Sequence, residues 1–178
     1  VATTMPHAPE GAKRSWNANP LITPLGYLEK PLTVQPARET IPARLKENGF
    51  KVTNDTANML WMDDALGALF AKLEETGQID NTIIFFFNDH GQSSKGTLYQ
   101  GGVHDPSIIW KKGGFKCGPS LDALVSNVDF TPTILDMADV KTDEKFDGES
   151  FLPYMNKEAE QAPRTLYHEL GYARAIRI

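Results

Sequence analysis

The sequence predicts an α/β fold with a mostly parallel central sheet flanked by helices. Residues 55–76 repeat apolar side chains every three or four positions, as an amphipathic helix does. Residues 83–87 form a continuous apolar run without alternation, which favours a strand that is covered on both faces. A helix followed by such a strand is half of a β–α–β unit, and a second strand is expected over residues 107–110.

The first helix has recognisable ends. Its apolar stripe consists of Met59, Met62, Leu66, Leu69 and Leu73. Asn54 or Asp55 is expected to cap its start, and Gly77 suits the position just past its end. A shorter helix is predicted over residues 130–137, with Asp129 as its cap and Pro132 in its first turn.

The rest of the chain divides the expected domain into three parts. Residues 1–53 are predicted as a proline-rich loop region, because seven of the twelve prolines lie within residues 1–43. Residues 54–155 carry the α/β core segment, and residues 156–178 begin a C-terminal region. Residues 173–178 alternate like a strand that breaks off, so we expect residues 1–178 to be part of a larger catalytic domain.

Composition restricts the possible partners. The 178 residues carry a net charge of -5 and contain no long basic run, which argues against nucleic-acid binding. The longest apolar stretch, residues 83–87, is far short of the roughly 20 residues of a membrane span. The single cysteine, Cys117, excludes a disulfide within the chain.

Polar residues follow the predicted buried strand, where ligands bind in open α/β sheets. Asp89 offers a hard carboxylate oxygen and His90 an imidazole nitrogen, so the pair is a candidate for binding a divalent cation; the alternative is a polar loop that ends the strand. Lys95 lies in a glycine-containing loop and is a candidate contact for an oxyanion, the alternative being a solvated lysine. His104 is expected to make a loop hydrogen bond.

Seven segments together resemble the sulfatase family of the alkaline-phosphatase-like superfamily. Gln100 departs from the pattern, since the family usually has glutamate there. The matching segments, in order, are Pro6-His7-Ala8-Pro9, Met62-Asp63-Asp64-Ala65-Leu66-Gly67, Asn81-Thr82-Ile83-Ile84 followed by Asp89-His90-Gly91, Lys95-Gly96-Thr97-Leu98-Tyr99-Gln100-Gly101-Gly102, Val128-Asp129-Phe130-Thr131-Pro132-Thr133-Ile134-Leu135, Asp147-Gly148-Glu149-Ser150-Phe151-Leu152-Pro153 and Arg174-Ala175-Ile176-Arg177.

The resemblance implies a fold, a reaction and a set of roles. The fold is the alkaline-phosphatase-like sulfatase sandwich, present only in part. The reaction is the calcium-assisted, arylsulfatase-like hydrolysis of sulfate monoesters, aryl or carbohydrate. Asp89 and His90 would be metal ligands, and Lys95 and His7 would be catalytic and substrate-binding. Such enzymes are periplasmic, secreted or lysosomal.

The resemblance also identifies what these residues lack. The family nucleophile, a formylglycine made from the cysteine of C-x-P-S-R, is expected in a missing N-terminal segment or a complementary chain. Cys117 begins a similar tetrapeptide, but Leu121 replaces the arginine and the position follows the lysine loop, so we treat it as coincidence. Two alternatives stay open: a phosphate or phosphonate ester hydrolase, and a non-catalytic fragment that binds a partner chain.

Overall fold

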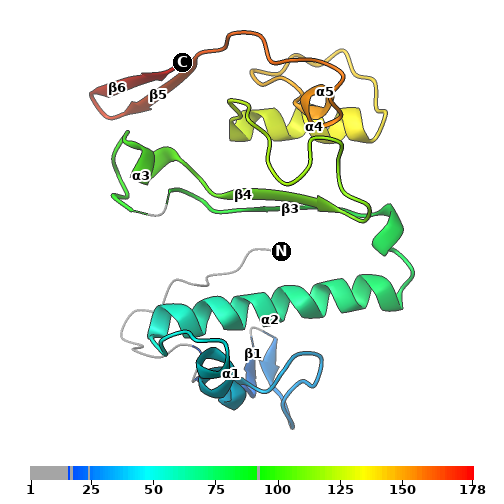
Figure 1. Cartoon of the computed structure of the whole chain (residues 1–178), viewed down its shortest axis with the longest axis vertical. Coiled ribbons are helices and arrows are strands. Elements are labelled where there is room, and N and C mark those ends of the chain that lie inside the picture. Colours follow the sequence, from blue (N-terminus) through cyan, green and yellow to red (C-terminus); the bar gives the residue numbers. More distant parts are fainter. Residues whose placement is uncertain (1–15, 17, 24, 92) are drawn as a thin grey trace. The chain divides into compact units, whose positions relative to one another are not determined.

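The structure, a computed structural model, describes residues 16, 18–23, 25–91 and 93–178 (Figure 1). These form two compact units, the first ending at Ile79 and the second running from Asp80 to Ile178. No helix within the described ranges combines the length and the apolar character needed to cross a membrane. Each unit is described by itself.

Two helices build the core of unit 1. They are α1 (Ile41–Glu47) and α2 (Asn54–Glu75). Ile41 and Leu45 are buried against Ala57 of α2, which joins the two helices. The Arg44 guanidinium adds a polar contact, because its Nη1 donates to Asp64 Oδ1 of α2 at 2.8 Å.

Regular structure is sparse in the described part of the predicted loop region 1–53. It comprises α1, the 3-10 helix η2 (Arg38–Thr40) and the two-residue strands β1 (Ile22–Thr23) and β2 (Gly26–Tyr27), which pair antiparallel. Pro42 does not interrupt α1, because it lies in the first turn, where its missing N–H has no helical partner to lose.

Helix α2 confirms the predicted helix but corrects its cap and its buried face. The cap is Thr53, whose Oγ1 accepts from the Thr56 amide while Thr56 Oγ1 accepts from the Thr53 amide. Within the predicted stripe Met62 is buried, whereas Met59 and Leu69 are exposed. Ala57 and Asp64 are buried instead, since they contact α1. Beyond the helix, Gly77 has a positive φ of 68°, as expected for its terminating position.

The sheet of unit 2 corrects the predicted strand direction. After the 3-10 helix η3 (Ile79–Asn81), strand β3 (Ile83–Phe87) pairs antiparallel with β4 (Ser107–Lys111), with Phe85 opposite Ile109. Both strands lie where they are predicted, but no parallel pair occurs among the residues that the structure describes. The expected burial of β3 on both faces is not met in unit 2 either, because none of its five residues is buried and Ile83 and Phe87 are exposed.

One face of β3 is covered by an aromatic cluster. The helix α4 (Phe130–Met137) has the predicted bounds and places Phe130 with its ring centroid 5.6 Å from that of Phe85 and 5.1 Å from that of Phe87. The centroid of Phe151 lies 6.2 Å from that of Phe130 on another side. Alternate residues of β3 therefore face α4, which fixes this strand within unit 2.

The carboxylate of Asp129 is fully buried and joins three segments of unit 2. Arg164 donates to both of its oxygens, at 2.6 and 2.7 Å. The backbone amides of Ser126 and Glu149 donate at 2.7 and 3.0 Å. Burial alone would raise the pKa of Asp129, but these hydrogen bonds outweigh it and the pKa is lowered.

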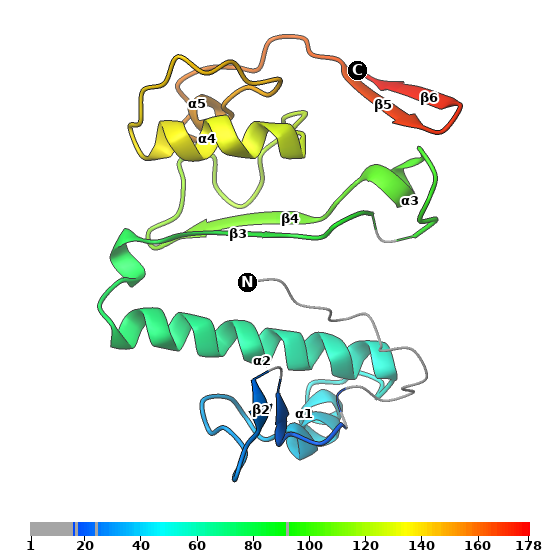
Figure 2. The same ribbon diagram turned by 180° about the vertical axis from the view of Figure 1, so that it is seen from behind.

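The motifs at residues 129–133 and 147–150 are explained by packing in unit 2. A Cβ on Gly148 would lie only 2.2 Å from the Val128 carbonyl oxygen, so only glycine permits this approach. The 3-10 helix η4 (Asn127–Asp129) and α5 (Leu152–Met155) flank the contact. The chain ends in an antiparallel hairpin of β5 (Leu166–Leu170) and β6 (Ala173–Arg177), which confirms the predicted strand (Figure 2).

Candidate functional site

The candidate site begins where β3 ends. Only Asn88 separates Phe87, the last residue of β3, from Asp89 and His90. The Asp89 side chain is 86% exposed. The His90 Nδ1 lies 2.7 Å from the Gly91 carbonyl oxygen, and a carbonyl oxygen only accepts. This contact therefore assigns the proton of the neutral imidazole to Nδ1 and leaves a lone pair on Nε2.

Asp89 and His90 fit a divalent cation as two of its ligands. The Nε2 atom of His90 is 3.6 Å from Asp89 Oδ1, so the two donor atoms converge. A hydrogen bond that fixes the tautomer of the ring is the usual support of a metal-binding histidine. A calcium ion takes six to eight oxygen ligands. Since the described residues contain no metal-binding group of three or more His, Cys, Asp or Glu, the pair supplies only part of such a site.

The loop after His90 folds back against the end of helix α3 (Gln100–Val103). The amide of Gly91 donates to the Gly102 carbonyl at 2.9 Å, and the amide of Ser93 donates to the Gly101 carbonyl at 2.8 Å. A Cβ on Gly91 would lie 2.5 Å from the Gly101 carbonyl oxygen, and one on Gly102 would lie 2.4 Å from that of Thr97. Gly91 and Gly102 are thus required by close backbone contact, whereas Gly96 is favoured by its positive φ of 81°.

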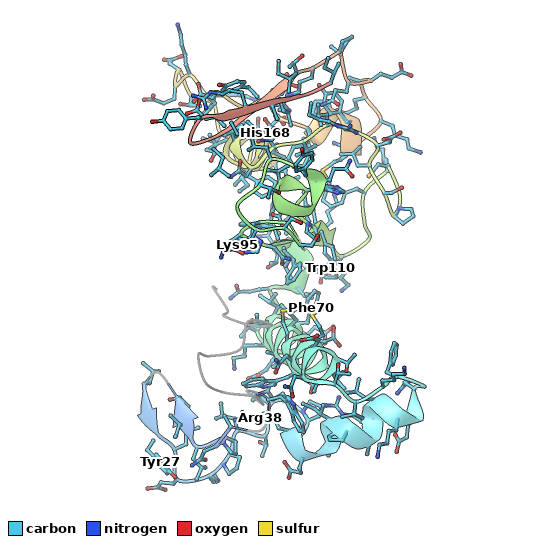
Figure 3. The ribbon with its side chains drawn as sticks, turned by 90° about the vertical axis from the view of Figure 1, so that its left-hand side faces the viewer. Tyr27, Arg38, Phe70, Lys95, Trp110 and His168 are labelled. Atoms are coloured by element: carbon cyan, nitrogen blue, oxygen red, sulfur yellow. The ribbon has the colours of Figure 1, made fainter. Side chains whose placement is uncertain are left out.

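Lys95 occupies the exposed turn of this folded loop (Figure 3). Ser94 and Gly96 on either side have positive φ angles of 56° and 81°. Thr97 Oγ1 closes the turn by donating to the Ser94 carbonyl at 2.9 Å. The loop therefore holds the backbone of Lys95 while its side chain reaches solvent, so it can act as a point charge for an anion. A common ligand of Asp89 and Lys95 stays a prediction.

Asp105 is a site residue that sequence reasoning missed. Its Oδ1 accepts from the Asn88 amide at 2.9 Å, directly before Asp89. Burial and the nearby charge of Asp89 raise the pKa of Asp105, whereas the hydrogen bond from Asn88 and the charges of His90 and His104 act in the opposite direction. The available signal was Asp105-Pro106 immediately ahead of a predicted strand.

The remaining sequence-predicted residues lie elsewhere or outside the described part. His7 lies outside the described residues, so its role stays a prediction. The backbone amide of Cys117 donates to the Met155 carbonyl at 2.8 Å, and its thiol is half-buried. The backbone amide of His104 donates to the Gln100 carbonyl at 2.8 Å as the last helical hydrogen bond of α3, so the loop hydrogen bond expected of His104 stays a prediction.

Comparison with known proteins identifies sulfatases among the relatives of this chain. A family model described as Sulfatase matches residues 21–140. The "Uncharacterized sulfatase YdeN" of Escherichia coli is 32% identical over 143 residues, which are 72% of this chain and 25% of that protein. An "Ulvan-active sulfatase" of Formosa agariphila is 36% identical over 118 residues, covering 64% of this chain and 19% of that protein.

A solved structure matches over a larger part of the chain. The phosphonate monoester hydrolase SpPMH from Silicibacter pomeroyi aligns with a TM-score of 0.57 and 29% sequence identity. The alignment covers 84% of this chain and 29% of that one. This chain therefore spans less than a third of the length of each of these three proteins.

Proposed function

The chain belongs to the sulfatase family, and from that premise we propose that it carries part of the active site of a sulfuric ester hydrolase. The expected substrates are sulfate monoesters of aryl or carbohydrate alcohols. We further propose that calcium assists the reaction and that the formylglycine nucleophile lies outside these 178 residues, which contain no C-x-P-S-R motif.

In this proposal Asp89 and His90 bind the cation through Oδ1 and Nε2. A bound divalent cation supplies a Lewis acid that offsets negative charge on the sulfuryl oxygens. The Lys95 ammonium lies against the sulfate group and stabilises charge on the leaving oxygen. His7 protonates that oxygen as a general acid. Every one of these roles is a proposal for the residue named.

One observation carries the proposal. The Nδ1 contact of His90 with the Gly91 carbonyl leaves Nε2 available 3.6 Å from the Asp89 carboxylate, at the end of a strand. Because imidazole nitrogen is a more usual ligand of transition metals than of calcium, the identity of the metal needs its own measurement.

The first experiment substitutes Lys95 in the native protein that contains these residues. We expect Lys95→Ala to lower kcat for an aryl sulfate about a hundredfold, the loss typical of removing one donor to a developing oxyanion. Lys145→Ala is the matched control, because Lys145 is also exposed and lies outside the site. Activity of Lys95→Ala within threefold of the wild type would contradict the proposed role. Metal analysis of the same protein distinguishes calcium from a transition metal.

A second candidate function is the hydrolysis of phosphate or phosphonate monoesters. The structural similarity to a phosphonate monoester hydrolase favours it, since that protein covers most of this chain. The two functions separate when matched aryl sulfate and aryl phosphonate substrates are compared by kcat/KM. A preference for the phosphonate would replace the proposed substrate class and leave the residue roles intact.

The isolated 178-residue chain is expected to be inactive on aryl sulfates, even with calcium. Without a nucleophile only binding and electrostatic stabilisation remain. Inactivity of the isolated chain also fits the reading that it serves to bind a partner chain, so the test with the native protein decides between them. Turnover by the isolated chain that Cys117→Ala abolished would instead identify Cys117 as the nucleophile.

A further inference from the structure

The paired register of the β3–β4 hairpin ends two residues before Asp89 and two residues after Asp105. The last residue pair is Phe87 with Ser107, and continuing the same register places Asn88 opposite Pro106 and then Asp89 opposite Asp105. Proline has no backbone N–H, so the ladder of hydrogen bonds cannot continue through position 106. The segment that leads to Asp89 needs another attachment if it is to stay in place.

The Asp105 side chain supplies that attachment. Its Oδ1 accepts from the Asn88 amide at 2.9 Å, in place of a backbone carbonyl. The carboxylate is half-buried, and the charges of Asp89, His90 and His104 act on it. A hydrogen bond to a charged, partly desolvated acceptor is stronger than one between neutral groups.

A second contact holds the other end of the same turn. The Gly91 amide donates to the Gly102 carbonyl at 2.9 Å, where a side chain on either glycine would collide with backbone. The residues on both sides of Asp89 and His90 are therefore fastened to one short segment, residues 102–105. The Asn88 amide is bound by the Asp105 side chain, and the Gly91 amide by the backbone carbonyl of Gly102.

We propose that Asp105 is a positioning residue, which sets the conformation of the Asp89–His90 turn by accepting the hydrogen bond of the Asn88 amide. The proposed role acts through the Asn88 amide and assigns Asp105 no contact with substrate or metal. Any role of the turn in catalysis rests on the proposed function, but the hydrogen bond through which Asp105 positions the turn does not. The hydrogen bond requires an acceptor at position 105 and does not require a negative charge, which makes Asp105→Asn the conservative variant.

The test measures amide exchange and backbone order by NMR in the native protein that contains these residues and in three variants. In Asp105→Ala we expect the Asn88 amide to exchange about tenfold faster, as loss of one hydrogen bond to a charged group implies, and backbone order at Asp89 and His90 to fall. Asp105→Asn keeps an acceptor but loses the charge, so its Asn88 amide should exchange at a rate between those of the wild type and Asp105→Ala. Asp143→Ala is the control, because Asp143 is exposed and far along the chain from the turn.

Three results would overturn the proposal. They are unchanged Asn88 exchange in Asp105→Ala, failure of Asp105→Asn to restore protection, and an equal loss of protection throughout β3, which would make Asp105 a general stability residue. If Asp105→Ala does not fold, the wild type itself provides the test. A scalar coupling across the hydrogen bond, between the Asn88 nitrogen and the Asp105 carboxyl carbon, should be present, and its absence would overturn the proposal. No arm measures sulfate ester hydrolysis, so a failure here is separate from a failure of the proposed function.

Discussion

At the scale of single residues, motif positions of the chain serve two different purposes. Gly91, Gly102 and Gly148 allow backbone segments to approach more closely than a Cβ permits. Asp129 forms a buried ion pair with Arg164, a role that its predicted position as a helix cap did not indicate. Asp89, His90 and Lys95 are exposed or half-exposed polar side chains whose orientation is set by such neighbours. A motif match by itself does not separate these groups, whereas burial does.

Gly91→Ala is expected to destabilise unit 2 by about 1–3 kcal/mol, because its Cβ would overlap the backbone of Gly101. Gly67→Ala is the matched control with the opposite sign. Gly67 lies inside α2, where an added Cβ would have nothing within 4 Å, so alanine should stabilise the helix by about 0.5–1 kcal/mol. Urea unfolding of both variants measures the two effects. An unchanged free energy of unfolding in Gly91→Ala would show that the loop can shift to accommodate the added Cβ.

Arg164→Met is expected to cost about 3–5 kcal/mol of unfolding free energy, because it leaves the fully buried Asp129 carboxylate without its cation. The control is Lys141→Ala, which removes an ion pair between exposed side chains and should leave stability unchanged. Denaturant unfolding at neutral pH measures both. Equal effects of the two substitutions would contradict the role given to burial.

The lowered pKa of Asp129 also predicts how stability responds to acid. The unfolded carboxyl titrates near pH 3.9, about the ordinary value for Asp. The stabilisation is complete above that pH and is lost as the pH falls through the lower pKa of the folded state. Wild-type stability should therefore fall more steeply below about pH 4 than that of Arg164→Met. Identical acid slopes would mean that Arg164 does not lower this pKa.

At the scale of elements, the sequence predicted where helices and strands lie better than how they pair. The periodicity of α2 and the bounds of α4 were predictable because they depend on local side-chain spacing. The antiparallel pairing of β3 was not, because it depends on a contact with β4 made across a loop. The cap of α2 was missed by one residue, since Asn54, Asp55 and Thr53 are all acceptable caps.

Of the candidate site, sequence reasoning singled out Asp89, His90 and Lys95, whose roles stay predictions, but not Asp105, which contacts the residue before Asp89. Asp89 and His90 stand out as donor types at the end of a strand. Asp105 does not, because its contact with Asn88 spans 17 residues and follows from the register of the hairpin. Residues that position others through long-range hydrogen bonds leave no local pattern in the sequence.

Thr53→Ala is expected to reduce stability by about 0.5–2 kcal/mol, the usual effect of losing a helix cap. The variant removes the acceptor for the Thr56 amide at the start of α2. Thr165→Ala changes the same residue type at an exposed position and serves as the control. Thermal unfolding followed by circular dichroism at 222 nm compares them. A cap at Asn54 would be supported instead if Thr53→Ala matched the control.

At the scale of the whole molecule, exposed apolar side chains outnumber buried ones. Among the described residues 23 large hydrophobic side chains are exposed, whereas seven hydrophobic residues are buried. Leu25, Tyr172 and Ile178 are almost completely accessible. Surfaces of this kind normally contact a partner or another part of the same protein.

The purified 178-residue chain is therefore expected to associate with itself and to bind hydrophobic dyes such as ANS. Sedimentation velocity across a tenfold range of concentration would show a rising average mass, because each added contact removes apolar area from water. A monodisperse monomer that unfolds in one cooperative transition would contradict this expectation. Addition of a moderate concentration of urea, which weakens apolar association, provides the control.

The ionic contact of Asp129 has a consequence for the rates of folding. Its bonds to Glu149 and Arg164 close loops of 20 and 35 residues, whereas its bond to Ser126 spans only three. Closing a long loop costs entropy before the contact forms, so we expect the contact with Arg164 to form after the rate-limiting barrier. Arg164→Met should then speed unfolding while folding keeps its rate, which stopped-flow measurements in urea can establish. A folding rate that slows in proportion would place the contact before the barrier. On this expectation the lifetime of the native state, rather than the time needed to reach it, depends on the Arg164 guanidinium.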